Sequence, residues 1–178
     1  FVVDLWGGHL SRDHATEWAE DTIINVWSST KTMAAMSMLV LADRGELDLN
    51  APVSRYWPEF GAAGKGDVKV SHFLAHTAGP SGLDVPVEGD ALYDWDWMVT
   101  QLAAQTPWWE PGTQSGYHAL TQGHLIGEVV RRVTGQSLGA FFRSEIAEPL
   151  DADFQIGVSD DSFARICDLT PPADPIAL

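Results

Sequence analysis

An uncharged apolar run at residues 32–42, TMAAMSMLVLA, constrains the fold of this chain more than any other segment. At 3.6 residues per turn its apolar side chains cover nearly every face, so the run predicts a helix with other elements packed all around it. Ser28 to Thr30 are candidate N-caps at its beginning, and Arg44 and Gly45 are residues that typically end a helix. We therefore expect the chain to bury this helix in its core.

Lys31 stands at the beginning of this run and is the only Lys or Arg between Arg12 and Arg44. A cation in the first helical turn opposes the helix dipole, and burying its ammonium group without a partner costs several kcal/mol. Packing alone therefore does not explain Lys31. Ser28 precedes it by three positions, which places both residues on one face of a helix. An apolar setting would favour the neutral amine, which could then act as a base that activates Ser28 as a nucleophile. A chance pairing is the alternative.

A second candidate lies in WEPGTQSGY, residues 109–117. Pro111 and Gly112 predict a turn, and Tyr117 follows the turn where a helix begins. A phenol in this position could relay a proton if nearby cations lower its pKa. A packed aromatic residue after a turn is the simpler interpretation.

The composition argues against several classes of function. The chain has 178 residues, of which 45% are hydrophobic, and this is enough for one compact domain with a core. Ten basic against 25 acidic residues give a net charge of −15, which disfavours nucleic acid as a partner. No apolar stretch is long enough to span a membrane. The single cysteine, Cys167, excludes an intrachain disulfide and favours a reducing, cytoplasmic location.

Hydrophobic periodicity and turn residues predict few strands and mostly helices. We expect β-like runs at 1–10 and 22–27, a short strand that continues into a helix at 68–79, and helices at 94–106, 117–135 and 137–150. GAAGKGD, at 61–67, reads as a flexible loop. The chain begins with Phe1 and ends in a proline-rich segment, so we expect it to be an incomplete part of a larger fold.

Other candidate sites are weaker. Ser81 lies in GPSGL, which resembles a G-x-S-x-G nucleophile elbow but lacks its last glycine. His72 and His76 have a metal-compatible spacing without a third ligand, so we expect no metal site. Four tryptophans could line one apolar pocket; these are Trp95, Trp97, Trp108 and Trp109.

Together these segments resemble the serine β-lactamase-like superfamily, and family VIII carboxylesterases in particular. The motifs that carry the resemblance occur in family order. They are SSTK at 28–31, LADRGELDLNAPVSRYWPEF at 41–60, VSHFLAHTAG at 70–79, WEPGTQSGY at 109–117 and RRVTGQSLGAFFRSEIAEPL at 131–150.

The resemblance implies an α+β fold with an antiparallel sheet flanked by helices and a mostly helical region. It divides the chain into a sheet region with the nucleophile helix at 1–60, a helical region at 61–157, and a connector at 158–178 toward further strands. These strands would belong to additional chain that completes the sheet.

The resemblance also implies site residues and an activity. Ser28 would be the acylated nucleophile, Lys31 its base partner and Tyr117 the third catalytic residue. Trp108 and His118 would border the substrate, with Trp109 as a brace for the tyrosine loop. No cofactor is implied.

Ala119 stands where the β-lactamases and carboxypeptidases carry an asparagine that binds the substrate amide. Alanine cannot make that hydrogen bond, so the expected substrate is a small ester and the expected enzyme a carboxylesterase. A β-lactamase or D-Ala-D-Ala carboxypeptidase is the alternative, and a non-catalytic binding protein on the same scaffold is another.

Overall fold

The computed structural model describes residues 2–170, which fall into two units. The larger unit is continuous and runs from Ser28 to Ile156, whereas the smaller one combines residues 2–27 with 157–170. This division differs from the predicted boundary at residue 60, because helix α1 (Thr30–Asp43) contacts helices α4 and α5 of the larger unit. The predicted connector at 158–178 falls in the smaller unit, and its residues 171–178 lie outside the described part.

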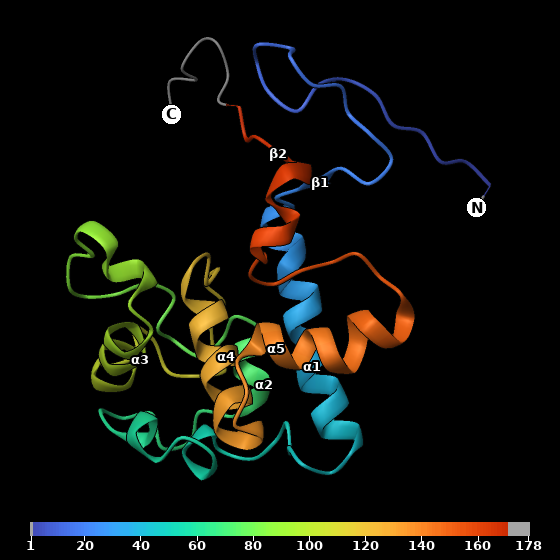
Figure 1. The fold of residues 1–178 in the computed structure, drawn as a ribbon. Coiled ribbons are helices and arrows are strands. Elements are labelled where there is room, and N and C mark those ends of the chain that lie inside the picture. Colours follow the sequence, from blue (N-terminus) through green and yellow to red (C-terminus); the bar gives the residue numbers. More distant parts are fainter. Residues whose placement is uncertain (1, 171–178) are drawn as a thin grey trace. The chain divides into compact units, whose positions relative to one another are not determined.

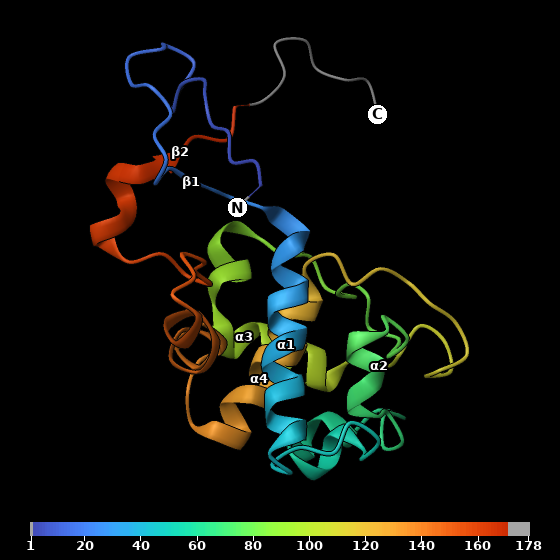
Figure 2. The same ribbon diagram turned by 90° about the vertical axis from the view of Figure 1, so that its right-hand side faces the viewer.

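Helix α4 (Thr121–Thr134) is the centre of the larger unit. It contacts α1 and also α2 (Val70–Leu74), α3 (Trp95–Ala104) and α5 (Leu138–Phe142), and Figures 1 and 2 show these helices around it. Its apolar face is fully buried and consists of Leu125, Ile126, Val129 and Val130. Gly135 ends the helix with a left-handed φ of 74°, as its sequence position predicts.

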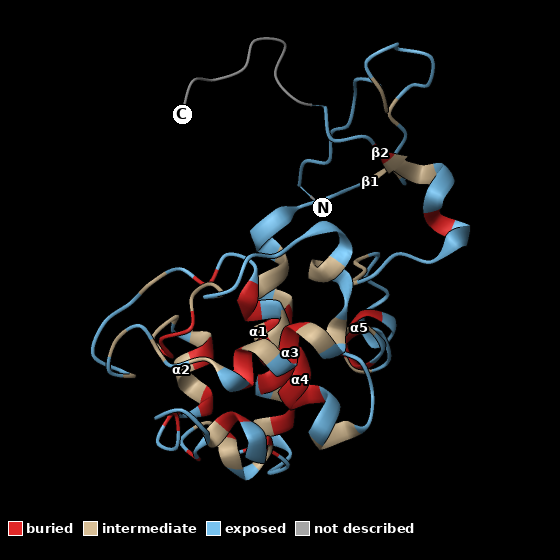
Figure 3. Ribbon diagram, turned by 90° about the vertical axis from the view of Figure 1, so that its left-hand side faces the viewer, coloured by how far each residue is buried: buried red, intermediate tan, exposed pale blue. Residues whose placement is uncertain are grey.

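Helix α1 is buried on one side only. Met38 and Leu41 are fully buried, and the buried residues in Figure 3 gather where α1, α3 and α4 face one another. On the other side Met36 is 36% exposed and Leu39 is 51% exposed. The helix was predicted to be covered all around, but no element of the described larger unit covers this side. Its end was predicted correctly, with Gly45 in the left-handed conformation at a φ of 73°.

The remaining helical elements are short. They are the 3₁₀ turns η1 (Trp27–Ser29), η2 (Val53–Arg55), η3 (Pro58–Gly61), η4 (Gly89–Tyr93), η6 (Glu148–Leu150) and η7 (Asp160–Arg165), and the π-helical turn η5 (Arg143–Ala147). The predicted helix at 137–150 is therefore α5 continued by η5 and η6. Ser137 caps α5 by accepting a hydrogen bond from the amide of Ala140, and Asp94 caps α3 in the same way.

Lys65 shows that the segment predicted as a flexible loop is anchored. Its side chain is fully buried, and its amine donates to the carbonyl of Ala103, at 3.0 Å, and to that of Gln105. These carbonyls lie at the C-terminal end of α3, where the helix dipole attracts a cation. Burial lowers the pKa of Lys65. The cation thus ties residues 61–67 to α3.

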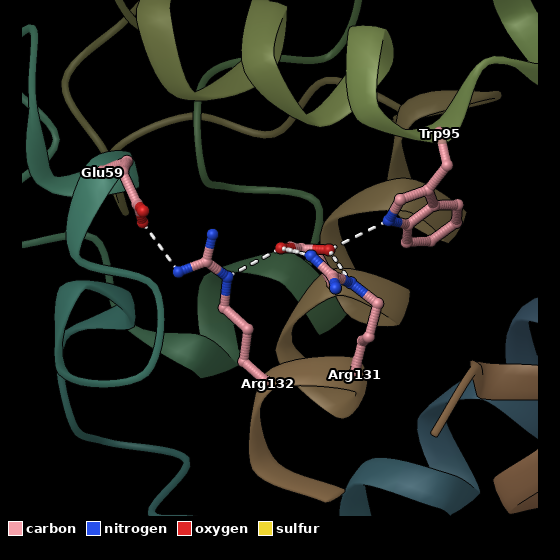
Figure 4. A network of polar contacts seen from close by, with 5 residues as sticks. Glu59, Trp95, Arg131 and Arg132 are labelled. Carbon is pink, nitrogen blue, oxygen red and sulfur yellow. Dashed lines mark hydrogen bonds and ion pairs between the residues drawn. The ribbon is translucent and has the colours of Figure 1, made fainter. Parts of the chain in front are cut away.

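A second buried charge connects α3 to α4. The carboxylate of Glu128 is fully buried and accepts hydrogen bonds from Arg131, Arg132 and the indole of Trp95, at 2.7–2.9 Å. Arg132 also contacts Glu59 at 2.7 Å, which extends the network to η3 (Figure 4). Burial alone would raise the pKa of Glu128, but the hydrogen bonds from Arg131, Arg132 and Trp95 outweigh it and hold the pKa below its usual value.

The smaller unit contains the sheet of the described residues, and this sheet is parallel. Strand β1 (Ile23–Ile24) pairs with β2 (Ile166–Cys167), so that Ile23 lies opposite Ile166. The predicted antiparallel arrangement is therefore wrong for this pair. The connection explains this. Along the sequence the whole larger unit, residues 28–156, separates β1 from β2, and parallel pairing requires such a long connection.

Residues 2–10 were predicted as a strand, but they form none. His9 makes an isolated antiparallel bridge to Glu17, and Val2, Val3 and Leu5 are exposed. In the part of the chain that the structure describes, no second strand lies beside residues 2–8 to form a ladder.

Candidate active site

Ser28 lies in η1, the turn that leads directly into α1, and its side chain is exposed. Ser29 occupies the N-cap position of α1 without a capping side-chain hydrogen bond. Because the helix begins at Thr30, Lys31 falls in its first turn and points back toward Ser28. The distance from Lys31 Nζ to Ser28 Oγ is 3.3 Å.

Tyr117 reaches the same hydroxyl from a segment far away in the sequence. Its phenol donates to Ser28 Oγ at 2.5 Å, and Lys31 Nζ lies 5.0 Å from the centre of its ring. Lys31 Nζ also donates to the carbonyl of Ala119 at 2.8 Å. The structure therefore brings together the three side chains that the sequence singled out. A hydroxyl in contact with a phenol and an amine has two groups nearby that can exchange its proton.

The phenol of Tyr117 is electrostatically adjusted for this exchange. The hydrogen bond with Ser28 lowers its pKa, burial acts in the opposite direction, and Lys31 lowers it further through a hydrogen bond and its charge. The net effect places the pKa below the ordinary value of 10.0. A phenolate is thus more accessible here than in a free tyrosine.

The segment that carries Tyr117 is fastened to residues 76–79. The amide of Gly112 donates to the carbonyl of Thr77 at 2.9 Å, and the indole of Trp109 donates to the same carbonyl at 3.4 Å. A Cβ at Gly116 would lie 2.3 Å from the ring of Trp109, so only glycine allows this packing. Trp109 is therefore placed as the brace that the sequence predicted.

His118 lies behind Tyr117 and does not form an exposed wall. Its side chain is fully buried, and its Nδ1 lies 2.6 Å from the carbonyl of Gly116. Its Nε2 has no hydrogen-bond partner, and neither has the buried Oε1 of Gln122. The predicted contact of His118 with the substrate stays a prediction.

Trp108 is 51% exposed and lies against a different loop. Its indole donates to the carboxylate of Asp84 at 2.6 Å, and its ring packs on Gly82. The structure does not test its predicted role as a substrate wall. The indole of Trp95, in contrast, donates to Glu128, and its ring lies 5.3 Å from that of His124 at a tilt of 38°, so Trp95 and Trp108 have different partners.

The other candidates are not assembled into sites. Ser81 follows Gly79 in a tight turn, in which its amide donates to the Gly79 carbonyl at 3.0 Å. His72 and His76 do not share a helix, because α2 ends at Leu74. Among residues 2–170 no group of three potential metal ligands occurs, and no helix is long and apolar enough to cross a membrane.

His76 lies beside Tyr117, and this contact was not predicted from the sequence. Its ring lies 4.8 Å from that of Tyr117 and 5.4 Å from that of His118, and its φ is 59°. Its place in AHTAG, just after a helix and before a glycine, is typical of a helix end, where a left-handed residue is common. That signal predicts the backbone but not the side-chain contacts.

Comparisons with known proteins agree on one family. The sequence model of the β-lactamase family matches residues 1–170. The chain is 42% identical to "Esterase/beta-lactamase LipL" of Mycobacterium tuberculosis over 97% of its own length, and 32% identical to "Esterase EstB" of Burkholderia gladioli over 80%. It also superposes on the crystal structure of a family VIII carboxylesterase with a TM-score of 0.92 and 49% identity over 96% of its length.

The chain spans less than half of each of these relatives. It covers 40% of LipL, 40% of EstB and 47% of the family VIII carboxylesterase. The family model, which matches residues 1–170, spans Ser28, Lys31 and Tyr117.

Proposed function

Because this chain belongs to the β-lactamase family, we propose that it is the catalytic part of a serine hydrolase, and specifically of a carboxylesterase that acts on small esters through an acyl-enzyme on Ser28. One observation carries the proposal. Ser28 Oγ lies 2.5 Å from the phenol of Tyr117 and 3.3 Å from the amine of Lys31. A serine needs such a neighbouring base to become a nucleophile.

The reaction would proceed in two steps. In the first, Ser28 Oγ attacks the ester carbonyl while its proton passes to the pair formed by Tyr117 and Lys31. The tetrahedral intermediate then expels the alcohol, which leaves with that proton, and the acyl group stays on Ser28. The Ser28 amide, just before α1, is one candidate donor for the oxyanion. In the second step, water gives a proton to the same pair and attacks the acyl-enzyme; the acyl–Oγ bond then breaks, the acid is released, and the pair returns the proton to Ser28 Oγ.

Ala119 favours an ester over an amide substrate. Its methyl side chain can donate no hydrogen bond, and its carbonyl is already bound to Lys31 at 2.8 Å. A substrate with a side-chain amide would therefore find no partner at this position, whereas a simple ester needs none. The esterase relatives, at 42% and 49% identity, support the same choice.

A β-lactamase is the second candidate, because one of these relatives is named an esterase/β-lactamase. Comparing turnover of a short-chain p-nitrophenyl ester with that of a chromogenic cephalosporin separates the two activities. We expect the ester to be the better substrate.

The first prediction concerns the nucleophile. In the complete protein, Ser28→Ala should abolish covalent labelling by a fluorophosphonate probe, because the substitution removes the attacking oxygen. Ser81→Ala is the matched control and should leave labelling largely intact, because Ser81 lies in a turn and, within residues 2–170, no base is hydrogen-bonded to its hydroxyl. Peptide mass spectrometry identifies the labelled serine. Labelling that survives in Ser28→Ala and vanishes in Ser81→Ala would overturn the assignment.

A further inference from the structure

We propose that His76 is a positioning residue for Tyr117, and that its neutral imidazole accepts the hydrogen bond that keeps the phenol beside Ser28. This inference rests on the proposed function, in which Tyr117 exchanges a proton with Ser28. Four features of the described residues support it, namely the contacts of His76, its backbone conformation, the tautomer of its ring and the charges around it.

His76 holds the chain on both sides of Tyr117. Its backbone carbonyl accepts a hydrogen bond from the amide of Gly116 at 3.1 Å. Its ring nitrogen Nδ1 accepts one from the amide of His118, also at 3.1 Å. Its ring lies 4.8 Å from the ring of Tyr117 itself. One residue thus fixes the backbone before and after the phenol and contacts the ring between them.

The backbone conformation of His76 indicates that its side chain has a role beyond ending the helix. Ala75 is the C-cap of α2, and the amide of Thr77 donates to the carbonyl of His72 at 2.9 Å, as in a Schellman helix end. His76 occupies the left-handed position of that motif, with a φ of 59°. Glycine is the usual residue there, because a side chain costs about 1–2 kcal/mol in this conformation. The helix end alone would therefore be better served by glycine.

The hydrogen bonds also determine which nitrogen of His76 carries the proton. Since Nδ1 accepts from the amide of His118, it cannot be protonated, and the hydrogen of the neutral ring must be on Nε2. The side-chain nitrogen of Gln122 lies 3.4 Å from that Nε2; since both nitrogens then carry hydrogens, this contact is not a hydrogen bond. Protonation of Nδ1 would replace the acceptor by a donor and break the link to Tyr117.

The surroundings keep His76 neutral. The titratable groups that face it are Lys31, Tyr117 and His118. Burial lowers the pKa of His76, and the nearby charge of Lys31 lowers it further. The neutral, accepting form therefore prevails at neutral pH, which agrees with the geometry.

Two variants separate the acceptor from the backbone and the ring. His76→Asn keeps an acceptor oxygen near the position of Nδ1 and tolerates the left-handed backbone, but it has no ring. His76→Gly suits the backbone better still, but it has neither acceptor nor ring. The two variants thus differ in the acceptor, and both are expected to fold.

We expect His76→Gly to lower kcat on a p-nitrophenyl ester about 10- to 100-fold with little change in KM, because the phenol is no longer held at Ser28. His76→Asn should stay within about threefold of the unaltered protein, since one neutral hydrogen bond is retained. A second readout needs no turnover: the pKa of the Tyr117 phenol, followed by NMR, should rise toward 10.0 in His76→Gly and stay lowered in His76→Asn.

The outcomes distinguish this proposal from the proposed function. If His76→Gly changes neither kcat nor the phenol titration, or if His76→Asn is as impaired as His76→Gly, the positioning role is wrong. An inactive but folded protein whose phenol titration still responds as expected would refute the esterase function and retain the positioning role. Should a variant fail to fold, the ¹⁵N shifts of His76 in the unaltered protein decide, and a protonated Nδ1 at neutral pH would overturn the proposal.

Discussion

At the scale of single residues, Lys31 and Tyr117 share the contacts to Ser28 but differ in what they can do with a proton. The phenol is the closer group, at 2.5 Å, and its pKa is lowered by Ser28 and Lys31. The amine is held by two oxygens, those of Ser28 and Ala119. Lys31 could accept the serine proton, or it could only stabilise a phenolate by its charge. Replacing it with a cation that cannot lose its charge distinguishes these two roles.

We predict that Lys31→Arg is nearly as damaging as Lys31→Ala, because a guanidinium group stays charged at any working pH and cannot act as a base. The measurement is kcat/KM on a short-chain ester, with Lys69→Arg as the control, since Lys69 is exposed and distant in sequence from the site. An arginine variant that keeps most of the activity would mean that Lys31 serves as a fixed positive charge.

Single residues were predicted from the sequence where a short motif describes them. Ser28 and Lys31 are three positions apart, so helical spacing alone brings them together. Tyr117 was found through its motif, although its contact to Ser28 spans 89 residues of sequence. His76 could not be found in this way, because its role depends on a left-handed backbone and on a bond from its ring to a backbone amide, neither of which leaves a periodic pattern.

At the scale of elements, the buried carboxylate of Glu128 decides how α3, α4 and η3 stay together. Two arginines and an indole donate to it, and Arg132 continues the network to Glu59. Neutralising the carboxylate would leave the two guanidinium groups without the negative charge that they pair with, which costs more than the intact network contributes. Tyr117 lies just before α4 in the sequence, so a network that holds α4 in place also supports the segment that carries Tyr117.

We predict that Glu128→Gln lowers the free energy of unfolding by about 2 kcal/mol at pH 7, as measured by urea denaturation. Because the folded-state pKa of Glu128 lies below the ordinary value of 4.5, its contribution is complete above that pH and is lost as the pH falls below it. The difference between the unaltered protein and the variant should therefore shrink on acidification. Glu88→Gln, at an exposed carboxylate, is the control and should change stability by less than about 0.5 kcal/mol. A constant difference between pH 7 and pH 3 would contradict this assignment.

The elements were predictable to the extent that local residues define them. Gly45 and Gly135 end α1 and α4 as expected, and α3 and α5 begin directly after Asp94 and Ser137, close to where helices were predicted to start. The beginning of α4 was placed four residues too early, since residues 117–120 serve the site and do not continue the helix. The parallel pairing of β1 with β2 was not predictable, because two strands so far apart in sequence carry no turn that would fix their direction.

At the scale of the whole molecule, two observations support the packing of additional chain on α1: the exposed side of this helix and the greater length of the relatives. Met36 and Leu39 lie exposed on a helix that was expected to be covered on every side, and the chain spans 40–47% of the three relatives named above. We propose that additional chain packs on this side and supplies a second donor to the oxyanion.

The corresponding prediction is that residues 1–178 expressed alone hydrolyse esters about 100- to 1000-fold more slowly than a full-length esterase relative in the same assay, which is the usual cost of one missing oxyanion donor. Fluorophosphonate labelling of Ser28 serves as the control that the site is formed. A soluble, cooperatively folding segment with turnover equal to that of the relative would contradict the proposal.

The pairing of β1 with β2 also sets an order of events during synthesis. At about 5–20 residues per second, a ribosome that has made Ile24 needs roughly 7–30 s to reach Ile166, its neighbour in the sheet. Residues 28–156 emerge in that interval and form a continuous unit, so Ser28, Lys31 and Tyr117 can meet while β1 still waits for its partner. In the nascent chain the three catalytic candidates would thus come together before the sheet forms. Until β2 is made, the backbone of β1 stays unpaired and could form incorrect strand pairings.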